Sequence, residues 1–265
     1  MAQYQSAQKQ DDAALTALWQ VCFGDAKSEI EAFWRIAKPT VFLAKENGRV
    51  VSMLCALFSP LIDSGGESQT AAYLYALCTA PEYRGRGLCR GLLSFAEKEM
   101  KKHAAYAALV PSEASLFDFY EKLGYRTAFY HKKYRVAAAG SAKIARLDTD
   151  GYRNLRELQL YGDFLSYDAP LLQWQKHLSE ASGAGLYRVE TDRCICCAAA
   201  EKHGDTLIIK ELLPDCSEAA AALAAELHCR EAEVRTNEMQ QPFGMIKALN
   251  SVPAPEQAYL GLAFD

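Results

Sequence analysis

The sequence predicts an α/β protein with a mixed sheet, in which one folded unit is followed by a partial copy of itself. Helical and strand periodicities alternate in the order two helices, three strands, helix, strand, helix, strand. Part of that order returns in the second half of the chain. Between the third strand and the next helix lies a turn rich in Arg and Gly, which is typical of an anion-binding site.

The elements of the first half follow from local signals. Residues 11–23 carry apolar side chains at helical spacing, and Asn47-Gly48 between two apolar runs indicates a β-hairpin. Gly124 suits the position just after a helix, where a left-handed backbone is needed. We expect helices at 11–23, 28–36, 88 to about 102 and before 124, and strands at 41–45, 50–57, 71–79, 106–110 and 125–136.

The second half begins after residues 137–142, which are small, lack periodicity and indicate a linker. The predicted domains are therefore 1–136 and 137–265. We expect helices at 150–161, 171–180 and 217–229, a meander of strands at 186–189, 194–200 and 206–213, a strand at 232–236, and terminal strands at 243–249 and 257–264.

The turn after residue 79 predicts a pyrophosphate site. Gly85 and Gly87 let the backbone approach a ligand closely, and the following helix directs its N–H groups at an anion. Arg84, Arg86 and Arg90 add charge-assisted contacts to phosphate oxygens. The glycine spacing matches neither a dinucleotide-binding fingerprint nor a Walker loop.

Two segments resemble motifs of the GNAT superfamily of acetyl-CoA-dependent N-acetyltransferases. Arg84, Gly87 and Cys89 take the three places of its motif A, [QR]-x-x-G-x-[GA], with Cys89 where Gly or Ala is usual. The run 119–125, Phe-Tyr-Glu-Lys-Leu-Gly-Tyr, is similar to its motif B. The second half resembles a degenerate GNAT-like unit, as in the enhanced-intracellular-survival type.

The resemblance implies acetyl-CoA as co-substrate and Tyr120 as the general acid that protonates the departing thiolate. It implies that strand residues near 77–79 bind the pantetheine arm and that N–H groups of 84–90 hold the pyrophosphate. The implied cofactor-binding residues are Leu77, Cys78, Thr79, Arg84, Gly85, Arg86, Gly87, Leu88, Cys89, Arg90 and Ser115. We expect no metal ion, and no cofactor in the second half, where Pro214-Asp-Cys-Ser replaces the Arg/Gly turn.

The expected function is transfer of an acetyl group from acetyl-CoA to a primary amine of a small molecule, peptide or protein. The alternative is a catalytically silent module that binds CoA or a protein partner. Several aromatic residues fit either an acceptor pocket or the core: Trp19, Phe33, Trp34, Tyr73 and Tyr75. The sequence identifies no general base.

The cysteines suggest a third class of function. Cys194 and Cys197 stand at C-x-x-C spacing, with His203 and Cys229 as the available helpers for a metal site. Buried thiols on a core strand are the favoured interpretation, and a redox- or metal-sensing protein is the rival. An odd count of nine cysteines indicates reduced thiols rather than a disulfide framework.

Composition narrows the partners and the compartment. A net charge of −4 argues against general nucleic-acid binding. No apolar run approaches the roughly 20 residues that span a bilayer, and the first residues lack the pattern of a signal peptide. We therefore expect a cytoplasmic enzyme with an amine-bearing acceptor and no membrane partner, and an oligomer is compatible with the sequence.

Overall fold

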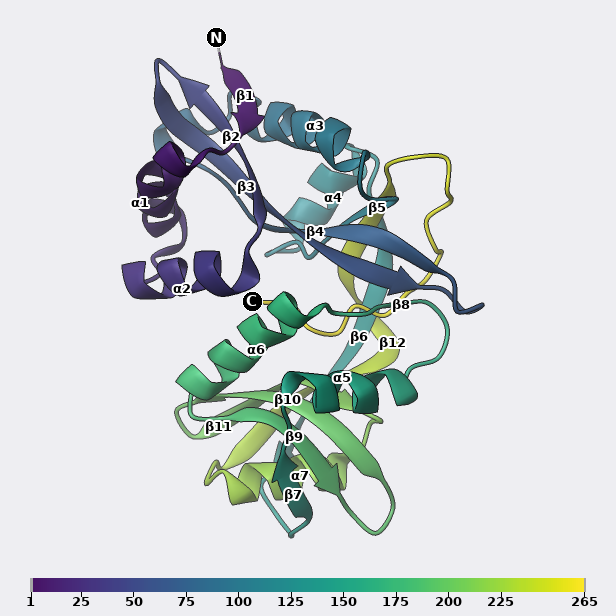
Figure 1. The fold of residues 1–265 in the computed structure, drawn as a ribbon. Coiled ribbons are helices and arrows are strands. Elements are labelled where there is room, and N and C mark those ends of the chain that lie inside the picture. The colour runs from purple at the N-terminus through teal and green to yellow at the C-terminus, as the bar shows by residue number, and fades with distance from the viewer. Residues whose placement is uncertain (1, 265) are drawn as a thin grey trace. The chain divides into compact units, whose positions relative to one another are not determined.

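The computed structural model describes residues 2–264 and divides them into two compact units (Figure 1). The first unit comprises 2–60, 69–126 and 245–254, and the second comprises 61–68, 127–244 and 255–264. The sequence predicted consecutive domains, 1–136 and 137–265, whereas these units exchange segments. The exchange arises because strands β3 (Arg49–Ile62) and β12 (Glu231–Ala248) each have residues in both units.

The first unit contains a sheet in the order β1-β2-β3-β4-β5-β12. Its strands are β1 (Gln3–Ser6), β2 (Thr40–Glu46), β3 (Arg49–Ile62), β4 (Ser68–Thr79) and β5 (Tyr106–Leu109), and its helices are α1 (Asp12–Phe23), α2 (Lys27–Ala37), α3 (Leu88–Met100) and α4 (Ser115–Glu121). Strands β4 and β5 are parallel, whereas β1 with β2 and β2 with β3 are antiparallel. Helices α1 and α2 cover one face of this sheet, and α3 and α4 cover the other (Figure 1).

Local signals place these elements as the sequence predicted. In α1, Leu15, Leu18 and Trp19 are buried, and the helix ends at Gly24 with a left-handed φ of 83°. The β2–β3 hairpin turns through Asn47 and Gly48, whose φ angles of 49° and 77° suit a tight hairpin turn. The expected helices and strands of this half are confirmed, with ends shifted by a few residues.

The second unit repeats the order of the first. Its elements are β6 (Arg126–Ala137), β7 (Lys143–Arg146), α5 (Thr149–Leu158), β8 (Phe164–Leu165), α6 (Ala169–Ala181), β9 (Gly185–Glu190), β10 (Ile195–His203), β11 (Thr206–Leu213), α7 (Ser217–Glu226) and the first part of β12. The sheet order β7-β9-β10-β11-β12 matches β1-β2-β3-β4-β5, and β11 is parallel to β12 as β4 is to β5. The fold class, a mixed-sheet unit followed by a second similar unit, is therefore confirmed.

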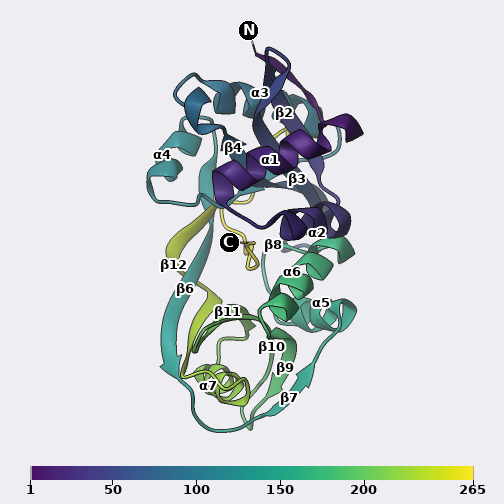
Figure 2. The same ribbon diagram turned by 90° about the vertical axis from the view of Figure 1, so that its left-hand side faces the viewer.

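Helices cover both faces of the sheet in this second unit. Figure 2 shows α5 and α6 together on one side of β9–β11 and α7 on the other, as Figure 1 does. Helices α5 and α6 each begin after an Asp whose carboxylate accepts a backbone N–H, from Gly151 to Asp148 and from Leu171 to Asp168. No helix within residues 2–264 has the length and apolar character needed to cross a bilayer.

The predictions for the end of the chain are wrong in part. Residues 243–248 are the end of β12 rather than a separate strand. The segment 257–264 makes isolated bridges, Phe129 with Ala258 and Phe164 with Tyr259, and forms no strand among the described residues. A few backbone bonds hold this segment, such as that from the Ala258 N–H to the Ala128 carbonyl. The Tyr167 hydroxyl adds to them, because it lies 2.6 and 2.7 Å from the carbonyl oxygens of Leu260 and Leu262 and shares its one proton between them.

Candidate active site

Strands β4 and β5 separate beside the predicted site. Their last paired residues are Leu74 and Leu109, where β5 ends, while β4 continues to Thr79. Ala76 lies inside this continuation with a φ of 50°, a left-handed conformation that is uncommon for Ala. Beyond Leu74, β5 therefore no longer pairs with β4. The backbone N–H and C=O groups on that edge of β4 are available to an extended ligand.

The end of β4 is fixed from the other side. The Ser52 hydroxyl donates to the carbonyl of Cys78 at 2.6 Å and lies 2.9 Å from the Thr79 hydroxyl. Cys78 and Thr79 are buried, and Leu77 is half-buried against the core below α3. The structure thus brings these three predicted residues together on the separated part of β4.

The Arg/Gly turn leads directly into α3. Gly85 and Gly87 both have left-handed φ angles, 74° and 76°, and Gly87 is the N-cap residue of the helix. Among residues 2–264, no heavy atom lies within 4 Å of where a Cβ on either glycine would stand, the chain neighbours aside. The first-turn N–H groups of Leu88, Cys89 and Arg90 lack intrahelical acceptors, as in any helix, and Gly87 offers no capping side chain. This turn is therefore an open concavity with backbone N–H donors at a helix N-terminus, the geometry that anion sites use, and anion binding there stays a prediction.

The three arginines of the turn play different parts. Arg84 donates from Nε to the carbonyl of Thr79 at 3.1 Å, so it braces the turn against β4. Arg86 donates from one terminal nitrogen to both carboxylate oxygens of Glu46, at 3.0 and 2.8 Å. Its guanidinium carbon also lies 5.2 Å from the centre of the Tyr83 ring. Arg90 is exposed in the first turn of α3. Arg84 and Arg86 thus stabilise the turn, and direct contact of the three arginines with phosphate stays a prediction.

Tyr120 lies near the C-terminal end of α4, next to the start of α3. Its side chain is 8% exposed and packs edge-on against Phe119 and Tyr125. Burial, with a smaller contribution from the nearby Cys89 thiol, raises the pKa of Tyr120 well above its ordinary value. The hydroxyl therefore stays protonated throughout the neutral range, and donating its proton to a thiolate is less favourable than for an ordinary tyrosine.

Two other predicted residues have clear environments. Burial raises the pKa of Cys89 to about 11, so this residue acts as a small apolar side chain in the motif rather than as a nucleophile. Ser115 is exposed in the first turn of α4, and its hydroxyl donates to Glu113 at 2.6 Å. It has no hydrogen bond to the Arg/Gly turn among those described.

The sequence did not indicate that the Cys22 thiol of α1 lies beside the end of β4 and the Arg/Gly turn. A hydrogen bond with Cys78 lowers the pKa of Cys22, and the nearby Arg84 guanidinium lowers it further. Burial raises this pKa, and the net result is a pKa of about 7. Its Sγ lies 3.7 Å from the Thr79 carbonyl. No local pattern could reveal this thiol, because its partners come from β4 and the turn.

Some aromatic residues of α1 and α2 lie in the core, and one lines a cavity. Trp19 and Phe33 are 3% and 0% exposed, and each contacts Tyr75, which assigns them to the core. Trp34 instead lines a cavity of about 670 Å³ between the two helices, with Glu31 and Arg35 at its wall. Its lining residues come from α1 and α2 alone, and a role of Trp34 in binding the acceptor stays a prediction.

The first unit is similar in sequence to known acetyltransferases. Residues 3–128 match the family model described as "Acetyltransferase (GNAT) domain". A glucosamine 6-phosphate N-acetyltransferase of Trypanosoma brucei brucei is 28% identical over 86 residues. That alignment covers 32% of this chain and 57% of the relative, so the chain spans little more than half of that protein's length.

Solved structures match both units. A GCN5-related N-acetyltransferase from Anabaena variabilis superposes with a TM-score of 0.73 at 16% identity, covering 94% of this chain and 73% of its own. A probable N-acyltransferase of unknown function from Enterococcus faecalis gives 0.70 at 14% identity, with coverages of 94% and 73%. Eis1 from Mycobacterium abscessus gives 0.66 at 13% identity, with 94% and 74%. These likenesses show the fold, including the second unit.

Proposed function

Since residues 3–128 form a GNAT acetyltransferase domain, we propose that the protein transfers an acetyl group from acetyl-CoA to a primary amine. The acceptor would be a small molecule, a peptide or a protein. The observation that carries the proposal is the open Gly85–Gly87 turn at the N-terminus of α3, directly after the part of β4 that β5 leaves. An extended ligand with a pyrophosphate at one end fits that pairing of features.

Each part of acetyl-CoA would have its place in this arrangement. The pyrophosphate would lie on the N–H groups from Gly85 to Arg90, where the helix dipole favours negative charge. The pantetheine arm would run along β4 beside Leu77, Cys78 and Thr79, using the backbone groups that β5 no longer pairs.

The chemistry requires little from side chains. A neutral amine attacks the thioester carbonyl, a carbon–nitrogen bond forms, the carbon–sulfur bond breaks, and the amine nitrogen releases one proton to water. The thiolate of CoA takes one proton, for which Tyr120 is the candidate donor, and the tyrosinate is then reprotonated from water, so no net proton is gained or lost. Backbone N–H groups near Cys78 and Thr79 would stabilise the oxyanion of the tetrahedral intermediate.

A panel of amines tests the proposal. Free CoA is measured with a thiol reagent after mixing the full chain, acetyl-CoA and one candidate acceptor at a time. The panel includes polyamines, lysine peptides, N-terminal peptides and glucosamine 6-phosphate, the last because the trypanosomal relative is named for it. Acetylated product with at least one amine supports the proposal. Tight CoA binding without transfer to any of them would favour the silent binding module.

A further inference from the structure

The second unit carries a cluster of three thiols where the first unit carries its Arg/Gly turn. Helix α7 follows β11 as α3 follows β4, and the N-cap of α7 is Cys216, in the place that Gly87 has in α3. Cys194 immediately precedes β10 and Cys196 is the second residue of that strand, which lies next to β11. The three sulfurs lie within 4.8 Å of one another.

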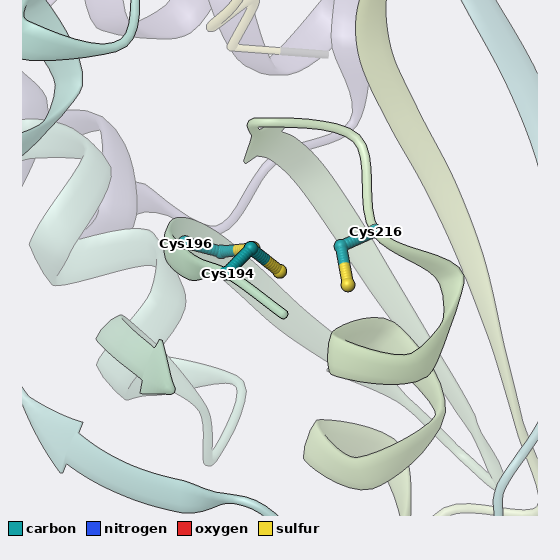
Figure 3. A group of neighbouring side chains, drawn as sticks. All are labelled: Cys194, Cys196 and Cys216. Carbon is teal, nitrogen blue, oxygen red and sulfur yellow. The ribbon is translucent and has the colours of Figure 1, made fainter. Parts of the chain in front are cut away.

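This set differs from the one that the sequence suggested. Cys197, the second residue of the C-x-x-C spacing, is fully buried beside Glu211 and Arg156 on the other face of β10. Among the described residues, neither His203 nor Cys229 belongs to the group. Figure 3 shows the Cys194 sulfur directed toward that of Cys216, with Cys196 behind it.

The sulfur spacing suits a metal ion. With metal–sulfur bonds of about 2.3 Å, two ligands of a tetrahedral zinc site lie about 3.8 Å apart. Cys194 Sγ and Cys196 Sγ are 3.5 Å apart, and no pair exceeds 4.8 Å, so small side-chain rotations would bring all three to bonding distance. Ligands from β10 and from the N-cap of α7 would join two elements that are distant in sequence.

The surroundings of the cluster leave room for a further ligand. Cys194 and Cys216 border a cavity of about 420 Å³ whose wall includes Lys132 and Arg193. The wall also includes Asp215 and Glu218, which pair with Lys132 and Arg193, so these charges balance one another. The size of the cavity is sufficient to admit water.

We propose that Cys194, Cys196 and Cys216 bind one Zn²⁺ ion, with water from the adjoining cavity as the fourth ligand. Zn²⁺ replaces the thiol protons as it binds, so its affinity falls as pH is lowered. The ion ties the start of β10 to the N-terminus of α7 and stabilises the second unit. Its site is independent of acetyl-CoA binding in the first unit.

Titration of the full chain with Zn²⁺ tests this proposal. The protein is reduced and stripped with a chelator, then titrated in competition with a chromophoric zinc chelator. We expect one Zn²⁺ per chain and a rise in melting temperature on binding. Cd²⁺ as a second probe is expected to give thiolate-to-metal charge-transfer absorption.

Variants decide which sulfurs bind. Cys194→Ser and Cys216→Ser, both at half-buried positions, are each expected to weaken Zn²⁺ binding at least tenfold and to remove most of the Cd²⁺ absorption. Cys22→Ser, a half-buried cysteine outside the cluster, is the matched control and is expected to bind as the unchanged protein does. Circular dichroism establishes that each variant is folded. Absence of zinc binding by the reduced protein, or equal binding by both cluster variants and the control, would overturn the proposal.

Discussion

Arg84 donates a hydrogen bond of 3.1 Å from Nε to the carbonyl oxygen of Thr79. The bond links the first residue of the Arg/Gly turn to the last residue of β4, so the turn and the separated strand edge are held as one structure. Cys22 Sγ lies 3.7 Å from the same carbonyl. The reactivity of the half-buried Cys22 thiol should therefore change when the turn is altered.

Cys22 is expected to react at lower pH than the other described cysteines of the first unit. Its pKa of about 7 makes the thiolate the major form above that pH, so the rate of alkylation should rise between about pH 6 and 8 and then level off. Arg84→Gln removes a charge that favours the thiolate, which raises the pKa and slows the reaction at pH 7. Mass spectrometry after timed iodoacetamide treatment measures both effects. Equal Cys22 rates in the two proteins at pH 7 would contradict the role of Arg84.

Tyr120→Phe keeps the ring and its packing and removes the hydroxyl. If Tyr120 is the general acid, kcat for the best acceptor should fall by about 10²–10⁴-fold while acetyl-CoA binding changes little. Tyr125→Phe is the control, because the Tyr125 hydroxyl donates to Glu97 at 3.0 Å and is not a candidate for the proton transfer. That variant should lose about 1–3 kcal/mol of stability with kcat nearly unchanged. A loss of turnover below about threefold in Tyr120→Phe leaves the residue a packing role only.

Local sequence signals predicted much of the first unit. The α1 periodicity, the Asn47-Gly48 hairpin and the Gly124 helix end each depend on a few neighbouring residues, and each is found. Strand β1 was missed because it is four residues long and lies at a sheet edge, with Tyr4 as its one large apolar side chain. Tyr4 packs against α3 at Gly91, where a Cβ would collide with its hydroxyl.

Long-range contacts account for what the sequence could not predict. Ala76 adopts a left-handed conformation in β4, a feature with no local signature in an Ala. Cys216 lies close to Cys194 and Cys196 because β10 and β11 are neighbours in the sheet. The C-x-x-C spacing had instead indicated Cys197 as the partner of Cys194. The segment 257–264 has the composition of a strand, yet a few backbone bonds and the Tyr167 hydroxyl hold it.

The second unit contains a buried ion pair that should control its stability. Arg156 and Glu211 are 1% and 0% exposed at their side chains, with Arg156 Nε 2.9 Å from a Glu211 oxygen. Arg156 also donates to the carbonyls of Leu165 and Leu260, and Tyr152 donates to Glu211. Glu211→Gln leaves the guanidinium without its charge partner, so the free energy of unfolding should fall by about 3–5 kcal/mol.

Urea denaturation measures that loss, and an exposed pair provides the control. Lys176 and Glu180 form an i,i+4 pair on α6 with substantial solvent exposure. Glu180→Gln should cost below about 1 kcal/mol. Similar losses in the two variants would show that the buried pair is not a major source of stability.

The second unit is expected to bind no CoA of its own. The segment 214–217 that precedes α7 lacks the Arg and Gly residues of the first turn, and Asp215 pairs with Lys132 at 2.9 Å there. A carboxylate at a helix N-terminus competes with an incoming phosphate. Native mass spectrometry with excess CoA should give one CoA per chain. A second bound CoA at comparable affinity would refute this expectation.

We expect the turn at Gly85–Gly87 to bind the pyrophosphate of acetyl-CoA, and a pair of variants at Gly87 measures the effect of charge at this turn. Gly87→Asn and Gly87→Asp impose the same left-handed strain and similar bulk, and both have open space for a Cβ, but Asp adds a negative charge. Titration calorimetry with acetyl-CoA should show Gly87→Asp binding at least about tenfold more weakly than the unchanged protein, a loss of ~1.4 kcal/mol or more. Gly87→Asn should fall between them. Unchanged affinity in a folded Gly87→Asp protein would place the cofactor elsewhere.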